Sequence, residues 1–166
     1  MIIGDISNHR LIQIKDHPSR FYLTGSQFFK VAGKKSDWDF FTADTTEIRN
    51  FLFSIGFTKE TNEKYLPLKN SAQPKTVVFV CGNIHIQLIP EADIEKKLKA
   101  QIFLHENNII KTIYSDPLLD EETRKEKSQS AWETVFMIQN SIGKATENTN
   151  HTPVKTTAIG KRRILW

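Results

Sequence analysis

The sequence has only one cysteine, Cys81, so it can form neither an intrachain disulfide framework nor a multi-cysteine zinc site. It also lacks any apolar run that approaches the roughly 20 residues needed to span a bilayer. The apolar run at the N-terminus covers only Met1 to Ile3 and is too short for the core of a secretory signal. We therefore expect a cytoplasmic protein with no membrane partner.

Excess charge is absent from most of the chain and present at one end. The net charge is +4, and residues 144–166 contain five basic residues and one acidic residue, which leaves 18 of each in residues 1–143. Residues 144–163 are rich in Thr, Asn and Lys and contain no aromatic residue. We expect residues 144–166 to form a basic, flexible tail that makes at most a weak contact with nucleic acid. A small nucleic-acid-binding protein that uses this tail is an alternative of a different class.

The rest of the composition is that of a globular protein. Hydrophobic residues make up 39% of the chain and charged residues 25%, and there are eleven Phe and three Trp. A chain of 166 residues has room for one sizeable core. We predict one domain over residues 1–143, of which about 91–143 form a C-terminal helical extension.

The clearest local element is a β-hairpin over residues 76–89. Two runs rich in β-branched residues flank Gly82-Asn83, which suits a two-residue turn of type I′ or II′. This turn pairs Cys81 with Ile84 and Val80 with His85. One face of the hairpin is then entirely apolar and is predicted to face the core, whereas the other face carries His85 and Gln87 and is a candidate site.

The remaining pattern predicts short strands and helices in alternation. Strands are expected over 20–24 and 36–42, with an edge strand over 65–68. Helices are expected over 27–32 after a Ser26 cap, from Thr45 or Thr46 to Gly56, over 92–106, and from about 120 to 142 with Gly143 as the stop. The fold class is therefore α+β: a small mixed sheet with helices packed on one face, followed by C-terminal helices.

Two aspartates in this pattern are candidate metal ligands. Asp37 and Asp39 are two residues apart on an expected strand, so both project from one face while Trp38 and Phe40 point into the core. Two close carboxylates repel each other, and a hard divalent cation such as Mg²⁺ or Mn²⁺ relieves that repulsion. Upstream, Gly25 allows the backbone to approach a phosphate closely, and Ser26 adds a hydroxyl at the expected helix start.

This arrangement resembles the nucleotidyltransferase superfamily typified by DNA polymerase beta. The family signature is an apolar residue, Gly, then Gly or Ser, a spacer of roughly nine to thirteen residues, and Asp-apolar-Asp-apolar. Here it is Leu23-Thr24-Gly25-Ser26, ten residues, and Asp37-Trp38-Asp39-Phe40, with Thr24 less apolar than the pattern prefers. The resemblance covers about 70 residues, from Arg20 to Pro90, and implies a nucleotidyltransferase-like fold with a nucleoside triphosphate as substrate.

The chain departs from the family at the third acidic residue. The family places that carboxylate on a later, neighbouring strand, as a metal ligand and as the base for the attacking hydroxyl. On the matching strand, 84–89, the available side chains are those of His85 and Gln87. A neutral His85 can ligate Mn²⁺ or act as a base, and Gln87 can contact the nucleotide. In the alternative interpretation His85 is structural and the two aspartates are merely solvated.

The sequence thus predicts a metal-dependent transferase that moves a nucleoside monophosphate from an NTP to a hydroxyl of a protein, an RNA end or a small molecule. Asp37, Asp39 and His85 are its predicted catalytic residues, Asp37 and Asp39 its metal ligands, and Gly25, Ser26 and Gln87 its nucleotide contacts. The alternative function is a catalytically degenerate protein of the same fold that acts as a binding or inhibitory module. The absent third acid favours this alternative, whereas the intact aspartate pair opposes it.

Overall fold

The computed structural model describes residues 3–33, 35–62 and 71–148 of the chain. These residues form two compact units, which we describe separately. The first, unit 1, lies within residues 3–62 and 75–94, and the second, unit 2, comprises residues 71–74 and 95–148. The boundary at residue 94 lies close to residue 91, where the sequence predicts the start of the helical extension. The fold class is α+β with a mixed sheet, as expected.

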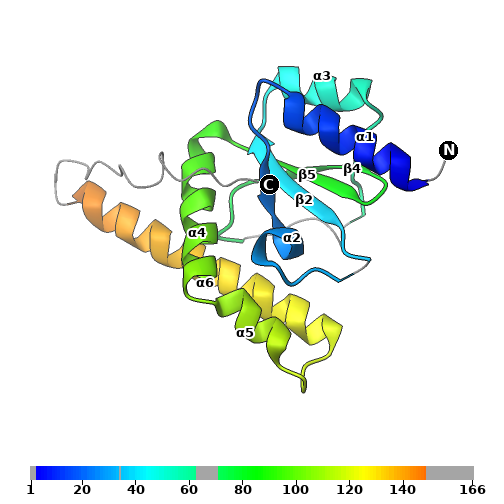
Figure 1. Cartoon of the computed structure of the whole chain (residues 1–166). Helices are drawn as coiled ribbons and strands as arrows, with labels where there is room; N and C mark the ends of the chain where they lie inside the picture. The colour runs from blue at the N-terminus through cyan, green and yellow to red at the C-terminus, as the bar shows by residue number, and fades with distance from the viewer. Residues whose placement is uncertain (1–2, 34, 63–70, 149–166) are drawn as a thin grey trace. The chain divides into compact units, whose positions relative to one another are not determined.

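Unit 1 contains the sheet, the helix α1 that precedes it and the helices that follow its first two strands (Figure 1). Its elements are α1 (Ile3–Asp16), β1 (Tyr22–Thr24), α2 (Gly25–Phe29), β2 (Trp38–Ala43), α3 (Thr46–Ser54), β3 (Thr58–Lys59), β4 (Val77–Cys81), β5 (Ile84–Ile89) and the 3₁₀ helix η2 (Glu91–Asp93). Unit 2 consists of α4 (Ile94–Glu106, except its first residue), α5 (Ile109–Ser115) and α6 (Glu121–Asn148).

Within the described residues, the sheet has five strands in the order β1-β2-β5-β4-β3. The β2–β5 pair is parallel and the other pairs are antiparallel. The predicted hairpin register is confirmed, because Cys81 pairs with Ile84 and Val80 with His85. Of the two turn residues only Gly82 has a positive φ, +59°, which is the pattern of a type II′ turn rather than type I′.

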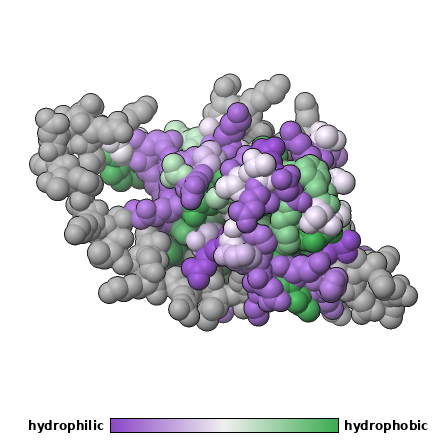
Figure 2. All heavy atoms as spheres, turned by 90° about the horizontal axis from the view of Figure 1, so that it is seen from above, coloured by the Kyte–Doolittle hydropathy of each residue, from purple (hydrophilic) through white to green (hydrophobic). Residues whose placement is uncertain are grey.

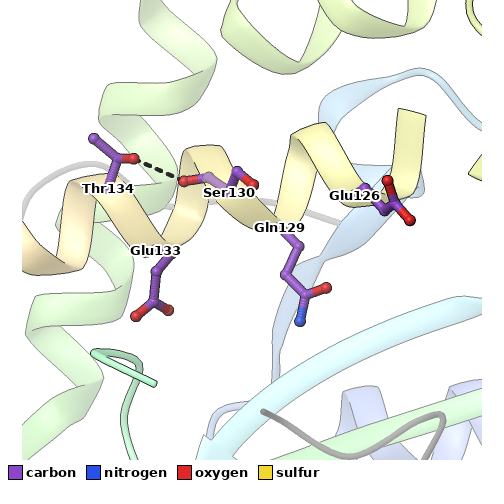
Figure 3. A pocket seen from close by; sticks show the side chains of 5 residues that line it. All are labelled: Glu126, Gln129, Ser130, Glu133 and Thr134. Atoms are coloured by element: carbon purple, nitrogen blue, oxygen red, sulfur yellow. Dashed lines mark hydrogen bonds between the residues drawn. The ribbon is translucent and has the colours of Figure 1, made fainter. Parts of the chain in front are cut away.

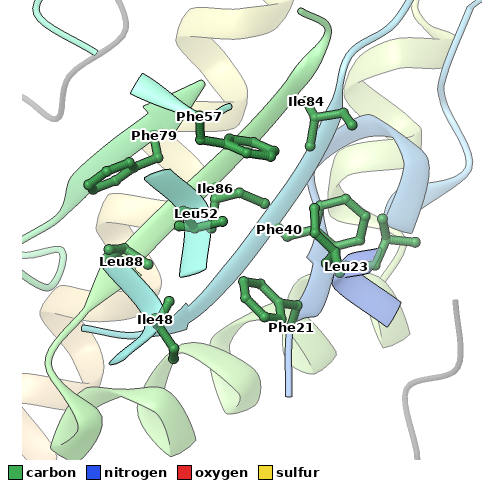
Figure 4. Close-up of a cluster of buried hydrophobic side chains, with 11 residues drawn as sticks. Phe21, Leu23, Phe40, Ile48, Leu52, Phe57, Phe79, Ile84, Ile86 and Leu88 are labelled. Atoms are coloured by element: carbon green, nitrogen blue, oxygen red, sulfur yellow. The ribbon is translucent and has the colours of Figure 1, made fainter. Parts of the chain in front are cut away.

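One face of this sheet is covered by α1 and α3, which lie side by side (Figure 1). Alternate residues of the strands point into the layer between sheet and helices, where they form the main core (Figure 4). The core residues are Ile14, Phe21, Leu23, Phe40, Ile48, Leu52, Phe57, Phe79, Ile84, Ile86 and Leu88. Phe40 and Ile86 are fully buried, which confirms that the apolar face of the hairpin faces the core.

Two elements of unit 1 were not expected from the sequence. The first is α1, whose Leu11 and Ile14 pack on the core while the Arg10 guanidinium donates to the carbonyl of Ile55 at 2.9 Å. The spacing of Leu11 and Ile14 fits a helix face, but Gly, Asn and β-branched residues in the segment weaken its helix propensity. The second is β3, whose two residues are too few to show an alternating pattern.

The helix after β1 starts and ends earlier than predicted. The helix expected over 27–32 is α2, Gly25–Phe29, and Thr24 occupies the N-cap position that the sequence suggested for Ser26. It ends at Lys30, which adopts a left-handed conformation (φ +59°) and whose backbone N–H donates to the carbonyl of Ser26. By contrast, the prediction of a helix that begins after a Thr45 cap is confirmed. The Thr45 hydroxyl accepts a hydrogen bond from the backbone N–H of Ile48 at 3.2 Å.

Unit 2 is held together around α6, on which α5 packs (Figure 1). Trp132 stacks on Phe136, and the Lys97 ammonium of α4 lies 5.4 Å from the centre of the Trp132 ring. The Glu133 carboxylate accepts from the hydroxyl of Ser71 and the backbone N–H of Ala72, at 2.6 and 2.5 Å, and so attaches residues 71–74 to the helix.

The predicted end of the last helix was wrong. Gly143 does not stop α6, which continues to Asn148, so the first five residues of the predicted flexible tail are helical. A glycine costs only about 1 kcal/mol inside a helix, and the good helix formers Lys144, Ala145 and Glu147 follow Gly143 in the sequence. The rest of the predicted tail, 149–166, and the edge strand predicted over 65–68 lie outside the described residues.

Hydrophilic side chains predominate on the face seen in Figure 2, and hydrophobic side chains form only small patches there. Among the described residues, no helix combines the length and the apolar character needed to cross a membrane.

Candidate functional site

The candidate site is built on one rung of the sheet, near the beginning of β2 and β5. Asp39 pairs with Thr24 of β1 on one side and with His85 of β5 on the other. Residues paired across strands project from the same face of a sheet, here the face opposite α1 and α3. The register therefore brings together Thr24 of the Leu23–Ser26 motif, the second predicted aspartate and the predicted third-acid position.

Asp39 and His85 are in direct contact. The His85 Nδ1 and Asp39 Oδ1 atoms are 3.3 Å apart, and the two side chains are 20% and 25% exposed. Each is the second residue of its strand in a parallel ladder, so the sheet register alone fixes their proximity. Solvent can still reach both groups, and both can therefore exchange ligands or protons.

Gly25 closes the other side of the Asp39 carboxylate. Gly25 has a φ of +66°, and a Cβ atom built on it would lie 2.5 Å from Asp39 Oδ2, which is closer than real Cβ contacts come. A side chain at position 25 would displace this carboxylate or the backbone. The requirement for glycine thus has two causes here, the left-handed conformation and the neighbouring acid.

The electrostatic environment of His85 is acidic. The contact with Asp39 raises the pKa of the His85 imidazole, and the charges of Asp37 and Glu60 raise it further, whereas partial burial lowers it. Glu60 was not predicted. Its backbone N–H donates to the carbonyl of Val78 at 2.8 Å, which extends the short β3 ladder by one residue. No pattern in the sequence could have identified it, because two-residue strands carry no period.

The other predicted site residues lie around this rung but not on it. Asp37 precedes β2 by one residue and is exposed, so it is not on the strand as expected, although its charge acts on His85. Ser26 is the second residue of α2, and no side-chain hydrogen bond from Thr24 caps this helix. Gln87 projects from the same face as His85 but pairs with Phe41, two residue pairs further along the ladder.

Two candidate donor side chains for a divalent cation, Asp39 and His85, are adjacent at this rung. Among the described residues, no three His, Cys, Asp or Glu side chains lie close enough together to hold an ion on their own. A cation bound to a nucleotide needs only one or two protein donors, because phosphate and water oxygens complete its coordination. Asp39 and His85 are two adjacent side chains at this rung, whereas the exposed Asp37 does not form a three-donor group with them.

A hollow runs along α6 in unit 2 (Figure 3). It has a volume of about 520 Å³ and is lined by Glu126, Gln129, Ser130, Glu133 and Thr134. The Thr134 hydroxyl donates to the backbone carbonyl of Ser130 at 2.8 Å, and Glu133 holds residues 71 and 72. None of the predicted site residues lies in this hollow.

Comparison with known proteins adds no relative: the chain matches no family model, no curated protein and no solved structure at a significant level.

Proposed function

We propose that unit 1 is a nucleotidyltransferase module that binds a nucleoside triphosphate with Mg²⁺ or Mn²⁺ and transfers its nucleoside monophosphate to a hydroxyl. The observation that carries this proposal is the rung Thr24–Asp39–His85. It brings the residue before Gly25, the second aspartate of the pair and the predicted third-acid position, which are up to 61 residues apart in the chain, together in adjacent strands.

The roles of the residues follow from their positions. Gly25 lets the backbone lie directly against the Asp39 carboxylate, and Ser26 of α2 offers a hydroxyl to a phosphate oxygen. Asp39 and Asp37 hold the cation, which when bound neutralises phosphate charge and polarises the α-phosphorus. His85 occupies the third-acid position as a ligand or as a base.

The reaction forms one bond and breaks one bond. The acceptor oxygen bonds to the α-phosphorus, the bond between the α-phosphorus and the bridging oxygen breaks, and pyrophosphate leaves with that electron pair. The acceptor proton passes to a base, for which a neutral His85 imidazole is the candidate among the predicted residues. The acceptor itself is a protein side chain, an RNA end or a small molecule.

The first test is a thermal-shift titration of the full chain with each NTP and Mg²⁺ or Mn²⁺. A ligand that binds only the folded state raises its apparent stability, so we expect a metal-dependent rise in melting temperature. The rise should vanish in the Asp37→Ala/Asp39→Ala double variant and persist in Asp16→Ala, which removes an exposed acid at the end of α1. No rise with any NTP in the wild type would contradict the proposal.

The second candidate function is a nucleotide-binding or inhibitory module without transfer activity. The imidazole in contact with Asp39, where the family has an acid, is the observation that favours it. The two functions separate in His85→Asp. A weakened transferase should gain activity in this variant, measured as pyrophosphate release from an NTP, whereas a binding module should stay inactive while still binding the nucleotide.

A further inference from the structure

We propose that the C-terminal half of α6 is a self-association surface, on which the same helix of a second copy of the chain packs along an apolar stripe. The stripe consists of Ala131, Val135, Ile138 and Ile142. It lies in unit 2, whereas the proposed nucleotide site lies in unit 1, so the two proposals can fail independently.

The spacing of the stripe is that of a seam between two helices. Its residues are alternately four and three positions apart, and this is the repeat with which paired α-helices interlock their side chains. Valine and isoleucine fill three of the four positions, so the seam offers branched apolar side chains to a partner. The helix that carries the stripe runs without interruption from Glu121 to Asn148. A second helix can therefore follow the stripe over its whole length.

Burial along the stripe changes within one turn. Val135 is 9% exposed and belongs to the core, whereas Ile138 and Ile142, on the next turns of the same face, are 52% and 62% exposed. The Gln139 side-chain amide donates to the backbone carbonyl of Lys96 at 3.0 Å, and beyond this contact α6 continues past α4 (Figure 1). The stripe thus starts in a packed interior and continues into solvent.

The exposed part of α6 also lacks charge. Residues 134–143 contain no Asp, Glu, Lys or Arg, although charged residues make up 25% of the chain. The exposed positions in this segment are Thr134, Met137, Ile138, Ser141, Ile142 and Gly143. Depletion of charge and enrichment of Met are typical of the centre of a protein interface. A neutral surface can meet its own copy without repulsion, whereas a surface for an acidic or basic partner would carry the opposite charge. The charge pattern therefore favours a second copy as the occupant.

The size of the stripe indicates a weak dimer. Stable interfaces bury about 1,200–2,000 Å² in total, and a contact of two heptads between two helices falls at the low end of this range. We therefore expect a dissociation constant between about 1 µM and about 1 mM. In a two-fold dimer each copy contributes the same stripe, so one substitution changes both sides of the contact.

Sedimentation equilibrium of the full chain, over concentrations that span this range, tests the inference. The wild type should change from monomer to dimer as its concentration rises. Ile138→Glu/Ile142→Glu places like charges opposite each other in the dimer and should raise the dissociation constant at least ~100-fold. Leu118→Glu is the matched control, because Leu118 is 91% exposed but precedes α6, and it should leave the dissociation constant unchanged.

A milder variant keeps the inference testable if the double variant does not fold, which circular dichroism reveals. Ile142→Ser removes an apolar side chain without adding charge and should also raise the dissociation constant, by less than the double variant does. A wild type that stays monomeric at the highest concentration would overturn the inference and leave the stripe to a different partner. A dimer that the folded stripe variants leave intact, or that Leu118→Glu weakens equally, would overturn it as well.

Discussion

Two aspartates at the two ends of β2 have similar exposure and different partners. Asp44 directly follows the strand and accepts two hydrogen bonds from the Arg49 guanidinium, at 2.6 and 2.8 Å. Asp39, the second residue of the strand, has the single 3.3 Å contact with His85. Their side chains are 27% and 25% exposed, so solvent access does not distinguish them.

The difference lies in the partner. A guanidinium stays charged at any physiological pH and binds both carboxylate oxygens, and the Arg49 hydrogen bond accordingly lowers the pKa of Asp44. An imidazole can lose its proton and offers one nitrogen at a time. Both Asp44 oxygens are therefore held by a partner whose charge is permanent, whereas Asp39 has a partner whose charge changes with pH. The next four experiments test this contrast.

The largest expected effect is on activity. Asp39→Asn should lower nucleotidyl transfer at least ~100-fold, because metal-assisted charge stabilisation is worth several kcal/mol and each 1.36 kcal/mol is tenfold in rate. Asp44→Asn, at the other end of the same strand, should leave the rate nearly unchanged. Initial rates of pyrophosphate release under saturating NTP measure both. Comparable losses of rate in Asp39→Asn and Asp44→Asn would show that the difference between the two aspartates does not affect activity.

The next effect is steric and compares two glycines. Gly25→Ala and Gly82→Ala both put a side chain on a left-handed backbone, which costs roughly 1–2 kcal/mol. Only Gly25 also faces a neighbour, Asp39 Oδ2 at 2.5 Å, whereas an added Cβ at Gly82 meets nothing within 4 Å. Overpacking adds about 1–3 kcal/mol, so urea unfolding should show a larger loss for Gly25→Ala. Equal losses would mean that Asp39 moves away without cost.

A smaller effect is expected from the Asp44–Arg49 pair. Its side chains are partly exposed, and exposed ion pairs contribute only about 0.2–1 kcal/mol, with the two-point geometry favouring the upper part of that range. Arg49→Ala should therefore reduce the free energy of unfolding in urea by less than about 1 kcal/mol. The loss should shrink near 1 M salt, where the Debye length is about 3 Å. A loss that salt does not alter would point to packing of the Arg49 stem instead.

The smallest effect is a pH dependence of stability. Because Asp39 raises the pKa of folded His85, protonated His85 stabilises the fold. The advantage of wild type over His85→Gln should be full between about pH 5 and 6.5 and disappear as pH rises through the folded pKa. Arg49 lowers the pKa of Asp44, so it is the ionised form of Asp44 that stabilises the fold. This contribution to the free energy of unfolding is present at neutral pH and is lost only as pH falls below about 4. Urea unfolding of wild type and His85→Gln across this pH range measures the difference in their free energies of unfolding. A difference that grows with pH would contradict the prediction.

How much of the site the sequence could predict depended on the range of the interaction. The Val80–His85 pair lies across a two-residue turn, and Gly82-Asn83 was enough to specify it. The partner of Asp39 could only be guessed from family resemblance, because a parallel β2–β5 pair has no local signal. Glu60 and α1 were not predicted for a related reason, since their positions are set by contacts with distant strands rather than by their own sequence pattern.

Local chemistry in the sequence determined the hairpin and its register, the Thr45 helix cap, the apolar face of the strands and the identity of the acidic residues. The tertiary structure decided which aspartate meets His85, which meets arginine, and where Gly25 lies. The reason is that turns, caps and alternation act over a few bonds of the chain. The pairing of β1 with β2 and of β2 with β5 instead depends on how the whole sheet buries its core under α1 and α3.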